Sequence, residues 1–208
     1  MFNLDQIVKS LQTDPNMQKT AMTGAAGLAA GLLIGKGGFG KIAKLGAAAA
    51  VGGLAYSAWQ KYQAQQGGAA SSPDAFTPAA EAEKEQLGKT LVRAMISAAK
   101  ADGRIDADEK EKIFAKLETM PLSAEEKAFV FDELASPLDI NAVVARADTP
   151  EHAAEIYAAS LVAMTADTAA ERAYLEALAS KLGLAPALVA EIHKAAEHPE
   201  QILPPGNV

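Results

Sequence analysis

Residues 95–117 (M-I-S-A-A-K-A-D-G-R-I-D-A-D-E-K-E-K-I-F-A-K-L) constrain the fold of this chain more than any other stretch. They read as the end of one amphipathic helix, a tight acidic turn and the start of a second helix. Gly103 can take the left-handed conformation that often ends a helix. Asp106 can accept hydrogen bonds from the first free N–H groups of the next helix, and Glu109 follows three residues later, as in a capping box. The stretch therefore predicts a helical hairpin with an acidic corner.

The rest of the chain from about residue 79 also has helical periodicity, and no segment shows the alternation expected of a strand. Residue types that begin helices recur along it. The predicted helix starts are at Ser123 with Glu126, Thr149 with Pro150, Thr168 with Glu171, and Pro186. Gly183 is a predicted helix end. These patterns predict an all-α domain of about seven helices over residues 79–198, followed by a tail at 199–208.

A weak internal repeat relates two parts of this domain. Residues 91–117 can be laid on residues 158–182, with the second turn three residues shorter. Asp102 then aligns with Asp167, and Glu109 aligns with Glu171. We expect two helical hairpins that face each other and bring the two acidic corners to related places.

The chain before residue 79 has a different composition, rich in Ala and Gly. Residues 20–35 and 45–60 carry no charge. Each run is shorter than the roughly 20 residues that usually span a bilayer. A helix exposed to water needs a polar face, however, and neither run has one. We therefore expect residues 20–62 to be a membrane-associated, Gly-rich segment, as one span or a hairpin. The alternatives are a pair of buried helices in a soluble protein, or a flexible Ala/Gly segment.

Small residues in the first run favour close helix pairing. Gly27, Gly31 and Gly35 fall four residues apart, a spacing that lets helix backbones approach closely in lipid. We expect self-association through these glycines. Residues 1–19 are predicted to form an amphipathic lead, and residues 63–78 a flexible Gly/Ser/Pro linker.

The composition argues against several classes of function. The net charge of −7 makes nucleic acid an unexpected partner. Without cysteine the chain has no disulfide and no thiol chemistry. His152, His193 and His198 match no catalytic or metal-binding motif, and we expect them on the surface. No enzymatic activity is expected.

The segment A-K-A-D-G-R-I-D-A-D-E-K-E-K-I resembles the signature of the TerB-like family, small helical domains associated with tellurite resistance. The layout of an Ala/Gly-rich membrane segment before such a domain resembles the YebE-like proteins of the bacterial inner membrane. The resemblance implies an all-helical domain with pseudo-repeats, an inner-membrane location, no enzymatic activity, and acidic residues that bind a divalent metal. Carried over by position, those residues are Asp102, Asp106, Glu109, Asp167 and Glu171. The second corner lacks the Gly and Ile of the first.

The residues themselves leave the role of these acids open. Calcium needs six or more oxygen ligands, and the first corner could supply some of them. Its spacing is not that of an EF-hand, because Ile113 stands where the bidentate acid should be. Alternatively, Asp106 and Thr168 only cap helices. We expect a non-enzymatic, membrane-anchored module with a role in the envelope or in stress response. It is expected to bind an unknown protein partner, with calcium as a candidate ligand. The alternative is a metal-dependent enzyme that uses the acidic corners.

Overall fold

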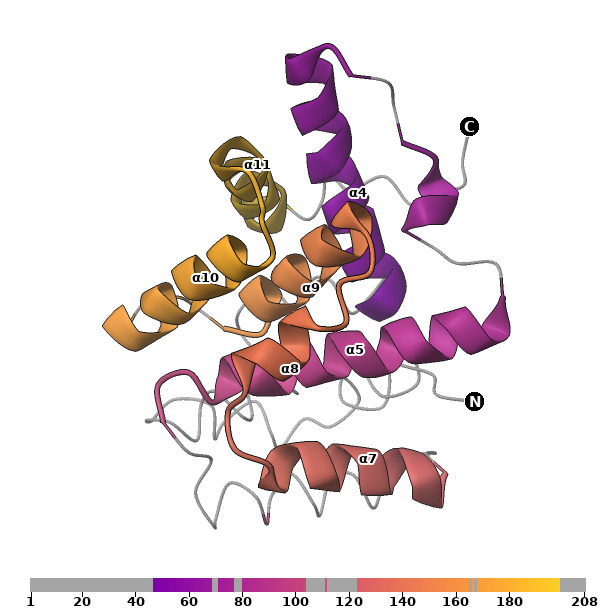
Figure 1. The fold of residues 1–208 in the computed structure, drawn as a ribbon, viewed down its shortest axis with the longest axis vertical. Helices are drawn as coiled ribbons and strands as arrows, with labels where there is room; N and C mark the ends of the chain where they lie inside the picture. The colour runs from indigo at the N-terminus through magenta and orange to yellow at the C-terminus, as the bar shows by residue number, and fades with distance from the viewer. Residues whose placement is uncertain are drawn as a thin grey trace.

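The computed structural model describes residues 47–68, 71–76, 80–103, 111, 123–164, 166 and 168–198. Within these residues the chain forms seven α-helices, one short 3-10 helix and no strand (Figure 1). The prediction of an all-α fold is confirmed for this part of the chain. The N-terminal lead, the uncharged run at 20–35 and the C-terminal tail lie outside the described residues.

The helices follow one another with short connections. In chain order they are α4 (Ala47–Gln66), the 3-10 helix η3 (Pro73–Ala75), α5 (Glu81–Ala99), α7 (Ala124–Ala135), α8 (Ile140–Val144), α9 (Pro150–Val162), α10 (Ala169–Lys181) and α11 (Pro186–Glu197). The helix expected to begin near Asp106 lies outside the described residues.

The predicted helix boundaries after residue 120 are confirmed because they depend on local chemistry. Ser123 and Thr168 each form a complete capping box with the glutamate three residues later. The Thr149 hydroxyl accepts a hydrogen bond from the His152 N–H at 3.1 Å, and Pro150 is the first residue of α9. Gly183, with a φ of 66°, follows α10 in the left-handed conformation.

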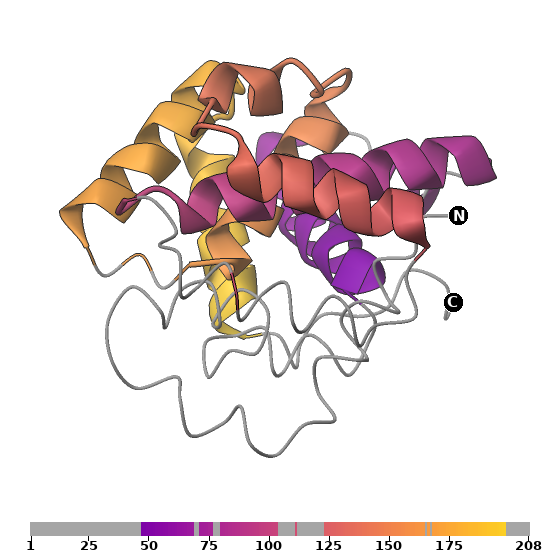
Figure 2. The same cartoon turned by 90° about the horizontal axis from the view of Figure 1, so that it is seen from below.

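Helix α9 is the centre of the fold. It packs against α4, α5 and α11, and Figures 1 and 2 show these helices gathered around it. Nine consecutive α9 residues are buried, from Ala153 to Leu161. In Figure 1, α5 separates α9 above it from α7 below it. The core is therefore built on a helix with almost no polar face, as is typical of a helix enclosed on several sides.

Helix α4 departs from the sequence-based expectation. It contains most of the uncharged run at 45–60 that was assigned to a membrane, yet it packs against α9 and α11. Its Val51, Leu54, Ala55 and Ala58 side chains are fully buried in the same core as those of α9. The run lacks a polar face because protein covers it, so the alternative of a buried helix applies here. No helix in the described residues is long and apolar enough to cross a membrane.

The expected flexible linker at 63–78 also differs from the structure. Helix α4 continues to Gln66, and residues 71–76, named the strap below, return along it (Figure 1). Phe76 is 2% exposed, and its ring lies 5.6 Å from the ring of Tyr56 and 6.1 Å from that of Trp59, measured between centroids. The Trp59 indole donates a hydrogen bond to the Ser71 hydroxyl at 2.8 Å. One buried aromatic side chain thus anchors a polar segment to the domain.

Candidate functional site

The first acidic corner is described only at its beginning. Asp102 is exposed in the turn after α5, and Asp106 and Glu109 lie outside the described residues. Helix α5 ends at Ala99 with Lys100 as its C-cap, and the Gly103 N–H donates to the Lys100 carbonyl at 3.2 Å. Gly103 has a φ of 158°, so the expected left-handed helix end is not found there.

At the second corner, Glu171 closes the N-terminus of α10 (Asp167 is outside the described residues). Its Oε2 accepts hydrogen bonds from the N–H and the hydroxyl of Thr168, both at 2.9 Å. Thr168 accepts from the Glu171 N–H at 3.1 Å in return. The capping role of this pair is therefore confirmed. Glu171 is 1% exposed, and its other oxygen, Oε1, has no hydrogen-bond partner in the described part of the chain.

The structure does not assemble the predicted ligands into a metal centre within its described portion. There, no three Asp, Glu or His side chains are placed to hold one ion together. Of the five predicted ligands only Asp102 and Glu171 can be located, the first exposed and the second buried as a cap. The prediction for Asp106, Glu109 and Asp167 falls outside the described residues.

A groove between α5, α7 and α8 is one of the concave surfaces in the described residues. Its volume is about 750 Å³. Basic, acidic and apolar side chains line it. They include Arg93, Ile96, Lys100, Glu133, Pro137, Leu138, Asp139, Val143 and Arg146.

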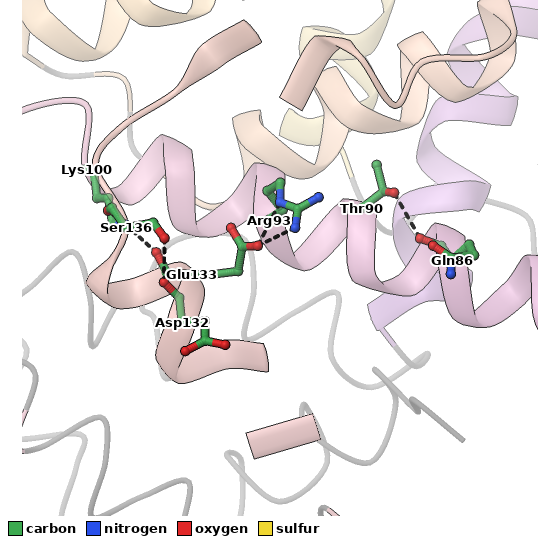
Figure 3. Close-up of polar contacts among 7 residues, drawn as sticks. All are labelled: Gln86, Thr90, Arg93, Lys100, Asp132, Glu133 and Ser136. Carbon is green, nitrogen blue, oxygen red and sulfur yellow. Dashed lines mark hydrogen bonds and ion pairs between the residues drawn. The ribbon is translucent and has the colours of Figure 1, made fainter. Parts of the chain in front are cut away.

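One wall of the groove is held by charged hydrogen bonds (Figure 3). The Arg93 Nε donates to Glu133 Oε1 at 2.8 Å, and a second guanidinium nitrogen reaches the same oxygen. The guanidinium also lies 5.6 Å from the centre of the Phe129 ring. Lys100 Nζ donates to the carbonyls of Glu133 and Ser136, near the C-terminal end of α7. These contacts fix α7 against α5.

The opposite side of the groove is open. Leu138 is 44% exposed, the one large apolar side chain with such exposure in the described residues. Asp139 caps α8, since its carboxylate accepts from the N–H groups of Asn141 at 2.9 Å and Ala142 at 3.1 Å. Arg146 is exposed and has no ion pair within the described part. The groove therefore offers an apolar contact beside a positive charge, which suits binding.

The expectation that the histidines are exposed on the surface holds for His198, whereas His152 and His193 are both partly buried. The His193 side chain is partly buried where α11 packs on α9, and its Nε2 lies 2.9 Å from the Tyr157 hydroxyl. Burial lowers the pKa of His193 and raises that of Tyr157 to about 12. The pair links two helices 36 residues apart in sequence.

The groove residues were not predicted from the sequence. Arg93 and Glu133 are 40 residues apart, and no local motif relates them. Leu138, which follows Pro137 in a turn, offered one signal: a large apolar residue outside any predicted helix. Glu155, in the otherwise apolar segment A-A-E-I-Y, was a second unused signal.

Comparison with known protein families assigns the chain to one of them. The family model described as a protein of unknown function, DUF533, matches residues 17–196. No curated protein and no solved structure shows significant similarity to the chain. The matched range includes α4 and the helices after it, except for the last residue of α11. The chain therefore belongs to the DUF533 family, a TerB-like family of unknown function.

Proposed function

We propose that this chain is a non-enzymatic TerB-like helical module, held at the bacterial inner membrane, that binds a protein partner in the groove between α5, α7 and α8. The observation that carries the proposal is the contrast within the groove. Arg93, Glu133 and Lys100 fix one wall, while Leu138 is left open to solvent. A surface that is already ordered loses little conformational entropy on binding.

The chemistry of the groove indicates the kind of segment that would bind. Arg93 and Lys100 have partners within the domain, whereas the Arg146 guanidinium has none among the described residues. Leu138 would contact an aliphatic or aromatic side chain, and Arg146 a nearby carboxylate. The partner is therefore proposed to present an apolar residue next to Asp or Glu.

Membrane anchoring is proposed for the first uncharged run. Since α4 is buried against α9 and α11, residues 20–35 are the remaining candidate. The resemblance to YebE-like proteins supports this location, and Gly27, Gly31 and Gly35 would support self-association. If the full-length chain is anchored, it stays in membranes washed with carbonate. Release into the wash would overturn this part of the proposal.

A divalent cation is a second candidate ligand, supported by one observation. The buried Glu171 Oε1 has no partner among the described residues, so it has a free lone pair at the capped corner. If calcium binds, the melting temperature rises with millimolar calcium and falls with chelator, because binding to the folded state alone stabilises it. A melting temperature unchanged by both would leave Glu171 as a cap and remove calcium as a candidate ligand.

The partner-binding proposal is tested by photocrosslinking in cells. A photoreactive amino acid replaces Leu138 in the full chain, and the control places it at Glu176, which is exposed on α10. We expect one discrete adduct from position 138, none from position 176, and loss of the adduct when Arg146→Glu is added. The same adducts from both positions, or an adduct that persists in the Arg146→Glu chain, would contradict binding in the groove.

A further inference from the structure

Glu155 is a buried acid without a partner. Its side chain is 0% exposed, and neither carboxyl oxygen has a hydrogen-bond partner in the described structure. An ionised carboxylate in such a place costs several kcal/mol, so the group stays neutral instead. Burial is accordingly the main cause that raises the pKa of Glu155 well above its usual value.

Glu155 of α9 lies beside Gly52 of α4, near the end of the strap. A Cβ atom added to Gly52 of α4 would lie 3.3 Å from Glu155 Oε1 and 3.0 Å from the Phe76 carbonyl oxygen. The absence of a side chain at Gly52 thus lets the end of the strap approach the carboxyl group. Helix α4 carries no charged residue between positions 47 and 60. This side of the site consequently supplies no cation that could stabilise an ionised Glu155.

The charged groups around α9 do not compensate Glu155 either. The negative charge of Glu151, one turn earlier on α9, is the second cause of the raised pKa of Glu155. The Ser71 hydroxyl of the strap donates a hydrogen bond to Glu151 at 3.4 Å. Asp74 on the strap is exposed, as is Glu176 on α10, and both are acids. His152, also on α9, is partly buried.

Several charged groups on neighbouring helices have partners of their own. Arg93 and Lys100 of α5 bind α7. On α11, Glu191 binds Lys194 and His193 binds Tyr157. Arg146 is exposed, and no described cation is hydrogen-bonded or ion-paired to the Glu155 carboxyl.

We propose that Glu155 is a proton-controlled latch: the strap closes on α4 while the carboxyl is neutral, and lifts when the proton is lost to water. The proposal is independent of the partner-binding function. Lifting the strap hydrates the carboxylate and removes the desolvation cost of its charge. It also separates Phe76 from Tyr56 and Trp59, so an aromatic surface on α4 becomes accessible.

The single tryptophan of the chain reports directly on this movement. Trp59 is 7% exposed, its indole is hydrogen-bonded to Ser71, and its ring packs against Phe76 of the strap. Acrylamide quenching of its fluorescence in the full chain is measured from roughly pH 5 to pH 9, a range across which a carboxyl with a raised pKa can titrate. Circular dichroism at each pH follows the helix content.

We expect quenching to rise with pH in the parent chain while the helix content is retained. In Glu155→Gln the rise is lost, because the amide cannot ionise. Glu155→Met, which has similar volume and no charge, loses it too and serves if the amide variant does not fold. In Gly52→Ala the added methyl displaces the strap, and quenching is already high at the acidic end. Glu151→Gln and His152→Gln keep the rise.

Three results would overturn the latch. The first is quenching that does not change with pH in the parent. The second is a rise of equal size in the parent and in both Glu155 variants, which would place the titrating group elsewhere. The third is loss of helix content together with the rise, which would make the event global unfolding.

Discussion

Two buried ionisable side chains, Lys100 between α5 and α7 and Glu155 between α4 and α9, differ in their hydrogen-bond partners. Lys100 is 9% exposed and donates to the Glu133 and Ser136 carbonyls. Glu155 is 0% exposed and has no partner in the described structure. The first interface satisfies its charge, whereas the second can hold its ionisable group only in the neutral form.

This difference predicts different responses to pH at the two interfaces. The Lys100 hydrogen bonds are made to two backbone carbonyls, which do not ionise. The Glu155 carboxyl, by contrast, is neutral only while it keeps its proton, and this depends on pH. The α5–α7 interface should therefore be a fixed platform, and the α4–α9 interface a responsive one.

The largest expected effect tests whether α4 is part of the core at all. Leu54 is 0% exposed. Leu54→Ala should lower the free energy of unfolding by about 2–5 kcal/mol, through lost burial and the cavity that remains. Denaturant unfolding of the full chain measures it. Leu138→Ala, an exposed control, should change little; equal and small effects for both would mean that α4 does not pack against α9.

A smaller effect tests the α5–α7 interface, where Lys100 has hydrogen-bond partners. Lys100→Met keeps the aliphatic stem but removes the donors to two carbonyls, and should cost about 1–3 kcal/mol. The matched control is Lys181→Met, since Lys181 is exposed and binds only Asn141 in the described structure. Its cost should stay within about 0.5 kcal/mol. Equal values for the two lysines would remove the contrast with Glu155.

The smallest effect concerns Glu171, a buried acid that falls between the two extremes. One of its oxygens is bonded to Thr168 and the other has no described partner. Thr168→Ala should cost about 1 kcal/mol, and Thr168→Ser much less, because serine caps as well. Thermal melts of the two variants measure this difference in stability. A Thr168→Ser chain as unstable as Thr168→Ala would show that the cap hydroxyl is not the stabilising group.

The parts of the fold that could be predicted from sequence are those decided within a few residues. A capping box such as Thr168 with Glu171 spans three positions, so its chemistry is visible without the rest of the chain. Helix α4 could not be placed this way. An uncharged helix has the same composition whether lipid or protein surrounds it, and α9 and α11, which decide the matter, lie about 100 residues later.

The candidate groove could be predicted from local sequence even less than helix α4. Arg93, Glu133 and Arg146 come from separate elements, and only folding makes them neighbours. Sequence reasoning instead selected the acids at the two turns. Of these, Glu171 acts in the structure as a helix cap, Asp102 is exposed, and the other three are not described.

The most direct test of the contrast is the pH dependence of the free energy of unfolding in the parent chain and in Glu155→Gln. The folded-state pKa of Glu155 is raised above its unfolded value of 4.5. Its contribution to stability is therefore fully present below about pH 4.5 and is lost as pH rises through the folded pKa. The lowered pKa of His193 acts in the opposite sense, destabilising the fold as pH falls below 6.5, but it is common to both chains and cancels.

Denaturant unfolding at a series of pH values gives the difference between the two chains. We expect Glu155→Gln to gain stability relative to the parent as pH rises, until the folded-state carboxyl has fully ionised. A difference that stays constant across the whole range would contradict it, because Glu155 would then titrate alike in the folded and unfolded chains.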